Sequence, residues 1–170
     1  NQQNPAINRD SIVYQDYAQT EGQFDWDIWS ADIWMQNNIQ YEAVSAYVGI
    51  DEQAPALWQD RIVWHEASAG DGNTDIYTRC LTEPGSLQQI TTDTRSQQNP
   101  DIDDRLIVWQ DNRHGHWDIF AYNRITRTEF RITTDTNDQT SPAVSGTIVA
   151  WQDTRDGAPN IYIADLAGYP

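Results

Sequence analysis

The chain has 170 residues, a normal size for one domain, and its 26 Asp and Glu against 10 Lys and Arg give a formal net charge of −16. This charge argues against binding to nucleic acids or anionic membranes, because both need clustered Lys and Arg. No stretch comes near the roughly 18 apolar residues of a membrane-spanning helix. The single cysteine excludes an intrachain disulfide, and the eight Trp and eight Tyr favour strands over helices.

In chain order, the first recurring element is a short segment around a proline. An aliphatic residue stands two positions after each of these prolines, and successive prolines lie 50, 45 and 42 residues apart. The four prolines are Pro5, Pro55, Pro100 and Pro142. A period of this length predicts a repeat architecture.

Three further blocks follow each proline at matched offsets. The second block joins aliphatic residues to an aromatic residue and an acid: Ile12–Asp16, Ile62–Glu66, Ile107–Asp111 and Val149–Asp153. The third block is short and ends in an aromatic residue: Asp27–Trp29, Asp75–Tyr77, Asp118–Phe120 and Asn160–Tyr162. The fourth block closes the central copies at Gln89–Asp93 and Arg131–Asp135, with Ile39–Tyr41 at the matching distance in the first copy. Each block has the length and the flanking turn residues of a strand.

Four short strands in each repeat of 42–50 residues predict an all-β fold, a β-propeller of four blades with four antiparallel strands per blade. The blades are expected near residues 4–41, 54–92, 99–134 and 141–166 of one domain, 1–170, and the last blade lacks its outer strand. The first copy carries an insertion between its second and third strands. A helical repeat would need apolar spacings of three and four over ten or more residues, and the chain has no such stretch.

The aromatic residue of the second block recurs as Trp64, Trp109 and Trp151, with Tyr14 in the first copy. We expect these residues to pack between blades, because a large flat side chain buries the most area there. Trp26 and Trp117 are predicted in loops, where packing explains them less readily.

The repeat resembles the TolB-like propeller repeat and, more loosely, the WD-repeat propellers. The resemblance rests on the turns Asp111–Phe120 and Asp153–Tyr162, which read Asp-x-Arg-x-Gly followed by Asp/Asn-Ile-aromatic. It covers nearly the whole chain and implies six blades or more, whereas this chain has four. Three architectures therefore stay open: a compact ring of four blades, an eight-bladed ring of two chains, or part of a longer propeller.

By this resemblance, the loops between the second and third strands and those between blades share one face. This face would carry the loops at Asp93 and Asp135 and the candidate ligand-binding residues Arg113, His114, His116, Trp117, Arg155 and Asp156. Aromatic residues beside planar polar groups are typical of sugar and peptide sites.

No cofactor is indicated, and calcium is the one alternative. Oxygen-rich loops offer the candidate calcium ligands Asp71, Asn73, Asp75, Asp153 and Asp156, although none has the full spacing of an EF-hand. Solvated loop histidines are favoured over a zinc or copper site at His114 and His116.

The sequence contains no motif of a hydrolase or of a phosphate-binding loop, so we expect no catalysis. The leading hypothesis is an extracellular or periplasmic module for protein interaction or surface assembly. A carbohydrate-binding lectin and an accessory propeller of a larger hydrolase are the alternatives. A protein partner or self-assembly is expected, a glycan is the alternative ligand, and neither nucleic acid nor membrane insertion is expected.

Overall fold

The computed structural model describes residues 1–20, 23–34, 38–45, 47, 49–67 and 72–169. Within this part the chain forms fifteen strands in four separate sheets and no helix, so it contains no helix that could span a membrane. The first two sheets contain β1 (Gln2–Asn8), β2 (Ser11–Thr20), β3 (Gln23–Trp34), β4 (Asn38–Ser45), β5 (Glu52–Trp58), β6 (Arg61–Ala67), β7 (Thr74–Cys80) and β8 (Glu83–Gln89). The others contain β9 (Gln97–Asp103), β10 (Leu106–Asp111), β11 (Asp118–Asn123), β12 (Thr128–Arg131), β13 (Gln139–Ser145), β14 (Ile148–Asp153) and β15 (Asn160–Asp165).

Each sheet is an antiparallel meander in which every strand pairs with its neighbours in sequence. We call the four sheets blades 1 to 4; the last has three strands, as predicted from the sequence. Two-residue turns join the first two strands in all four blades, and three of these turns begin with a residue at positive φ: Arg9 (54°), Gln59 (54°) and Gly146 (60°). Such turns match the right-handed twist of the strands that they connect.

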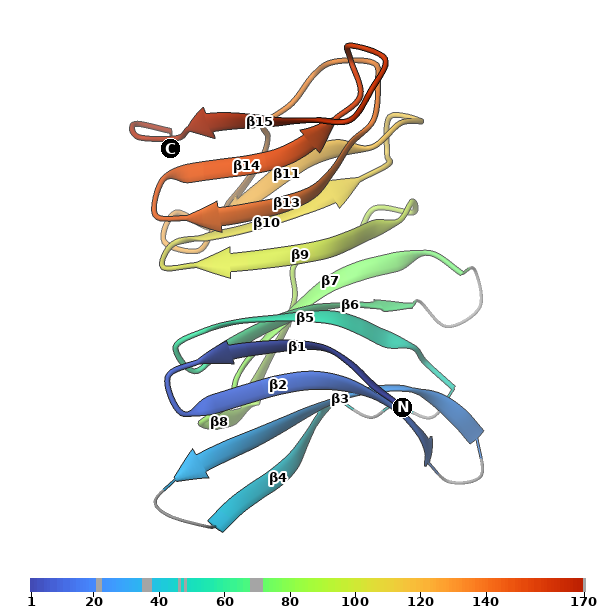
Figure 1. Cartoon of the computed structure of the whole chain (residues 1–170), viewed down its shortest axis with the longest axis vertical. Coiled ribbons are helices and arrows are strands. Elements are labelled where there is room, and N and C mark those ends of the chain that lie inside the picture. The colour runs from blue at the N-terminus through green and yellow to red at the C-terminus, as the bar shows by residue number, and fades with distance from the viewer. Residues whose placement is uncertain (21–22, 35–37, 46, 48, 68–71, 170) are drawn as a thin grey trace.

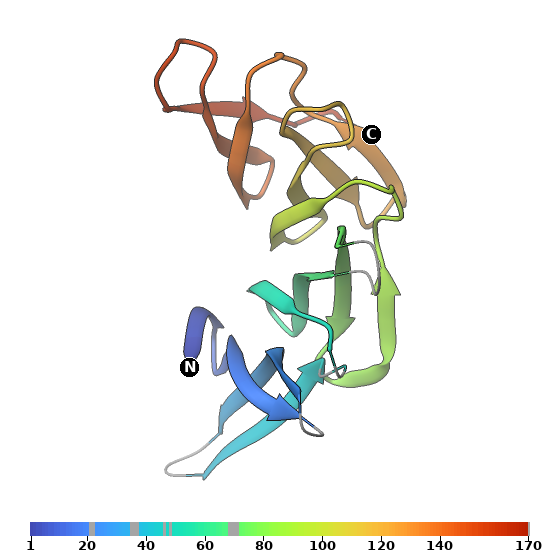
Figure 2. The same ribbon diagram turned by 90° about the vertical axis from the view of Figure 1, so that its right-hand side faces the viewer.

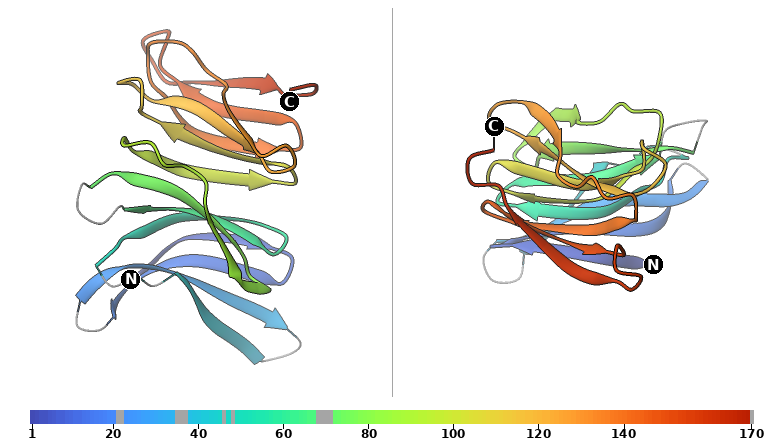
Figure 3. Two further views of the ribbon diagram at one scale, coloured as in Figure 1. Left: turned by 180° about the vertical axis from the view of Figure 1, so that it is seen from behind. Right: turned by 90° about the horizontal axis from the view of Figure 1, so that it is seen from above.

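The blades stack face to face along an arc, with the N-terminus in blade 1 and the C-terminus in blade 4 at the opposite end (Figure 1). The first strands of the blades, β1, β5, β9 and β13, lie next to one another along the concave edge of the arc (Figure 2). The arc stays open between blade 4 and blade 1 (Figures 2 and 3), so the structure does not show the compact four-bladed ring.

Apolar side chains fill the three spaces between consecutive blades. In each space, the blade face that carries the second-strand Trp packs on the face of the preceding blade that carries a Val or Ile. The three clusters contain Val13, Ile28, Ile62 and Trp64; Val63, Ile76, Ile107 and Trp109; and Val108, Ile119, Val149 and Trp151. The predicted role of the repeated Trp as a packing residue is therefore confirmed, since Trp64 and Trp109 are completely buried.

Each buried Trp also has a fixed polar partner. The indole N–H of Trp109 donates a hydrogen bond to the Asp111 carboxylate two residues later, at 3.0 Å, and its ring stacks on Phe120 with 6.3 Å between centroids. The same pair of contacts recurs in blades 2 and 4. The acid of the Trp-Gln-Asp block thus accepts the hydrogen bond of an indole N–H that is buried and needs a partner.

Three predictions differ from the observed strands. The blocks ending in Thr-Asp were predicted as fourth strands, but β8 and β12 end at Gln89 and Arg131, before the threonines. The hydroxyl groups of Thr91 and Thr133 instead accept hydrogen bonds from the third strands, at 2.9 and 2.8 Å. The insertion of the first copy lengthens the β2–β3 hairpin, so Trp26 lies in a strand and not in a loop.

Candidate functional site

The described loops of blades 3 and 4 lie close together at one end of these blades, and we call this surface the loop face. It consists of the loops between their second and third strands and the segment that leads from blade 3 to blade 4. Backbone and side-chain hydrogen bonds tie these loops together across blades. Trp117 N donates to Asp138 Oδ1 at 2.9 Å, Gln139 N donates to Trp117 O at 2.7 Å, and Thr154 N donates to Asp138 O at 3.1 Å. The predicted arrangement of these loops on one face agrees with this pattern.

Arg113 is the central side chain of the blade 3 loop. Its guanidinium donates to both carboxylate oxygens of Asp111, at 3.0 and 2.6 Å, and to Glu129 at 2.7 Å. It also lies 4.3 Å from the centroid of the Phe120 ring. Burial alone would lower the pKa of Arg113, but the two carboxylates outweigh burial and raise it. The guanidinium is therefore held in one orientation, with both a charge partner and an aromatic platform.

Blade 4 repeats this arrangement. Arg155 donates to Asp153 at 2.5 Å and stacks 4.3 Å above the Tyr162 ring. Burial alone would raise the pKa of the Asp153 carboxyl, but hydrogen bonds from Arg155 and Trp151 lower it to about 2. Asp156 accepts a hydrogen bond from the Tyr162 hydroxyl at 2.5 Å. The candidate residues Arg155 and Asp156 thus contact the same ring.

The remaining three candidates lie around the same loop of blade 3. His114 is exposed, with its ring 6.1 Å from that of Phe120. The Nε2 atom of His116 is 3.5 Å from the buried carboxylate of Asp118. Trp117 is half-buried and has its backbone in the network described above. His114 and His116 therefore contact residues of their own blade, whereas the backbone of Trp117 is also bonded to Gln139 of blade 4.

A hollow of about 430 Å³ lies between blades 3 and 4 at the loop face. Arg155 and Tyr162 line it from one side, and the segment from Ile132 to Asp135 lines it from the other. Of the six candidate residues, only Arg155 lines this hollow. Sequence reasoning placed Asp135 on this face but did not show that it faces Arg155.

The candidate calcium ligands belong to two separate segments of the chain, as the sequence analysis has them. Asp71 lies outside the described residues, and Asn73 and Asp75 belong to blade 2, whereas Asp153 and Asp156 belong to blade 4. Asp75 and Asp153 already accept hydrogen bonds from side chains of their own blades. Among the described residues, no three His, Cys, Asp or Glu side chains form a group suited to a metal ion.

Comparison with known proteins identifies the fold. TolB from Acinetobacter baumannii superposes with a TM-score of 0.76 over 99% of this chain, at 17% sequence identity. A putative TolB from Agrobacterium tumefaciens gives 0.70 over 94% of the chain, at 15% identity. This chain has a TolB-like β-propeller fold. No protein-family model matches the sequence, and no curated protein matches it either.

This TolB-like chain spans 42% and 58% of the length of those two structures. The β-propeller domain of the Trilobed protease from Pyrococcus furiosus, described as having an open velcro topology, is also similar, with a TM-score of 0.67 at 15% identity. The match covers 97% of this chain and 51% of that domain. The comparisons therefore confirm the resemblance stated from the sequence at the level of the fold.

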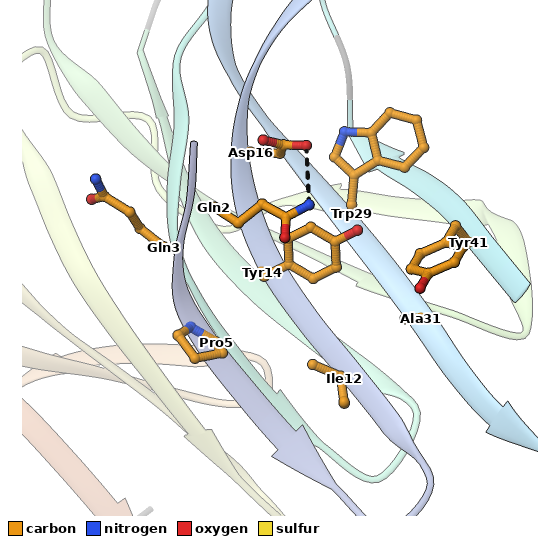
Figure 4. Close-up of a pocket in the computed structure, with 9 residues that line it drawn as sticks. All are labelled: Gln2, Gln3, Pro5, Ile12, Tyr14, Asp16, Trp29, Ala31 and Tyr41. Carbon is orange, nitrogen blue, oxygen red and sulfur yellow. Dashed lines mark hydrogen bonds between the residues drawn. The ribbon is translucent and has the colours of Figure 1, made fainter. Parts of the chain in front are cut away.

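The TolB-like chain has a second hollow, of about 630 Å³, which sequence reasoning missed (Figure 4). It lies over the face of blade 1 that carries Tyr14 and Trp29, the counterparts of the Trp and aromatic pairs buried in the other blades. Gln2 and Asp16 are hydrogen-bonded at its edge, at 3.4 Å. The replacement of Trp by Tyr14 in the first repeat was the one signal in the sequence that blade 1 has a different environment.

Two buried titratable side chains lie where blades meet. Glu52 is completely buried, and burial raises its pKa to about 8, although Tyr47 N and Ser45 Oγ donate hydrogen bonds to its Oε1. His65 accepts a hydrogen bond from Asn99 N of the next blade at 3.4 Å, and burial lowers its pKa to about 4. Both side chains are therefore favoured in their neutral forms near neutral pH.

Proposed function

We propose that this chain is a non-catalytic protein-interaction module that binds its partner through the loop face. The observation that carries the proposal is the rigid construction of that face. Its loops are bonded to one another across blades, and Arg113 and Arg155 are each held by a carboxylate and an aromatic ring. A preorganised surface loses little conformational entropy on binding, which favours affinity.

The charge of the chain favours a partner with a basic surface. A net charge of −16 attracts positive groups at long range and raises the rate of encounter. The resemblance to TolB supports a periplasmic location, with an extracellular location as the alternative. A glycan ligand stays the alternative binding hypothesis for the same face.

The test uses charge reversal at exposed positions. The immobilised chain is incubated with periplasmic or secreted proteins, and captured proteins are identified by mass spectrometry. The double variant His114→Glu with Asp156→Lys changes the loop face without removing an arginine from its ion pair. The control variant, Asp104→Lys with Arg127→Glu, changes exposed residues at the opposite end of the blades.

We expect a protein that is captured by the wild type and the control variant, is lost with the loop-face variant, and binds more weakly as salt is raised. Capture that is equal for all three chains would refute the loop face as the binding surface. A glycan array with the same three chains tests the alternative, because glycan binding lost only in the loop-face variant would favour a lectin.

A second candidate function is an accessory propeller of a peptidase. It is favoured by the similarity to the propeller domain of the Trilobed protease, of which the chain covers about half. The test is the mass of the native polypeptide that contains this sequence. A peptidase domain in the same polypeptide would support this function, and a native polypeptide without one would exclude it.

A further inference from the structure

The two ends of the arc each present a sheet face to solvent. The front face, on blade 1, consists of the residues around the 630 Å³ hollow, with Ile12, Tyr14, Trp29 and Tyr41 as its apolar members. The back face, on blade 4, carries Ile148, Ala150, Gln152, Ile161 and Ile163, which the β14–β15 register places on one side of the sheet together with Asp165. Ile161 and Ile163 are 74% and 70% exposed, which is unusual for adjacent aliphatic side chains of a sheet.

These faces correspond to the two sides of the contacts inside the arc. Ile12 and Tyr14 occupy the positions of Ile107 and Trp109, which are completely buried against blade 2. On the other side, Ala150 occupies the position of Val108, which is completely buried against blade 4. The front face therefore has side chains of the kind that pack on a preceding blade, and the back face has side chains of the kind on which a following blade packs.

A recurring hydrogen bond between consecutive blades shows that polar groups at the two ends of the arc also match the two sides of an internal contact. In each internal contact, the backbone N–H before the repeated proline donates to a second-strand side chain of the preceding blade. Ala54 N donates to Gln15 at 2.9 Å, and Ser141 N donates to Gln110 at 3.0 Å. The Asn99–His65 bond is the third example.

The residue before each proline has positive φ, a conformation that non-glycine residues seldom adopt. The φ values are 51° at Ala54, 50° at Asn99 and 53° at Ser141, and Asn4, at the corresponding position of blade 1, has the same conformation, at 47°. Gln152 on the back face occupies the acceptor position of Gln110. The chain thus carries a fourth donor and a fourth acceptor at opposite ends of the arc.

We propose that the front face of one chain packs on the back face of a second copy, so that two arcs close into one ring. Asn4 N of each copy donates to Gln152 of the other, and the aliphatic side chains of the back face fill the hollow over Tyr14 and Trp29. A head-to-tail contact of this kind forms a closed ring when the rotation between copies completes a turn. Closure also covers the exposed sheet faces at both ends.

The test is the mass of the particle in solution, measured by light scattering over a range of concentrations at about physiological salt, because two chains of charge −16 repel at low ionic strength. We expect a dimer with twice the 19.5 kDa mass of the chain. The variants Ile12→Glu and Ile161→Glu should each give a monomer. Ile125→Glu, which changes an isoleucine that is 76% exposed in a loop of blade 3, should stay dimeric.

Mixing provides a test that misfolding cannot imitate. A complex of the Ile12→Glu chain with the Ile161→Glu chain has one intact contact and one damaged contact, so dimers should reappear on mixing. Gln152→Ala should weaken the dimer about tenfold or more through loss of one hydrogen bond in each contact.

Three results would overturn the proposal. A wild-type chain that stays monomeric at every concentration would mean that the two faces do not bind each other between copies. A dimer that only one of the two glutamate variants disrupts would join two copies through the same face of each copy. A dimer that neither variant disrupts would use a different surface.

Discussion

Replacement of Glu52 by Gln should change how stability depends on pH. Glu52 is buried with a pKa of about 8, whereas an exposed glutamate has a pKa near 4.5. The folded chain therefore holds a proton that the unfolded chain releases between these values, and wild-type stability falls as pH rises through this range. One proton corresponds to about 1.4 kcal/mol per pH unit, so about 4 kcal/mol is lost between about pH 5 and pH 9.

Gln should fit this position well, because Gln97 and Gln139 occupy it in blades 3 and 4. Their side-chain amide nitrogens donate to the carbonyl oxygens of Arg95 and Asn137, two residues earlier. A Gln at position 52 would also keep the oxygen that accepts from its two donors.

The assay is urea unfolding of the wild type and Glu52→Gln across about pH 5 to 9, with the exposed Glu83→Gln as the control. We expect the difference in the free energy of unfolding between Glu52→Gln and the wild type to grow with pH, up to about 4 kcal/mol. The control should run parallel to the wild type. Parallel curves for Glu52→Gln and the wild type would refute the assignment of a buried, protonated Glu52.

Two further substitutions test the contacts between blades. Because burial lowers the pKa of His65 to about 4, the unfolded chain binds a proton before the folded chain does as pH falls. The free energy of unfolding of the wild type should therefore fall by about 3 kcal/mol between pH 7 and pH 4. His65→Gln keeps an acceptor for Asn99 N and should abolish this loss in the same urea assay. An unchanged pH profile would contradict the burial of His65. Trp109→Ala should lower the free energy of unfolding by about 3–5 kcal/mol, because it removes a completely buried side chain and the donor to Asp111. A decrease of less than about 1 kcal/mol would mean that this contact between blades is not formed.

The repeat in the sequence was sufficient to predict the propeller, the number of blades and the packing role of Trp64, Trp109 and Trp151. These features follow from local periodicity, because alternation along a strand decides which side chains share a face. Periodicity also predicted the missing fourth strand of the last blade. It misplaced the ends of β8 and β12, because the hydroxyl groups of Thr91 and Thr133 accept the hydrogen bonds of third-strand N–H groups that a strand ladder would direct to backbone carbonyls.

The role of the candidate site in ligand binding stays a prediction. The sequence placed Arg113 and Arg155 in turns between second and third strands, and the structure has them there. Their fixed orientation was not predictable, because the partner Glu129 and the loop that holds Asp138 are distant in sequence from Arg113 and Thr154 respectively. Contacts of this kind depend on how hairpins and blades lie in space, which spacing along the chain does not specify.

The sequence by itself determined what each blade is, since every repeat carries the residues that form its strands and both of its faces. Only the tertiary structure decided how the blades are arranged: as an open arc, with the half-buried Tyr14 lining a hollow at one end and Ile161 exposed to solvent at the other. The physical reason is that the same repeat can be buried or exposed according to whether a neighbouring blade covers it. That neighbour is a property of the assembled blades and not of any single repeat.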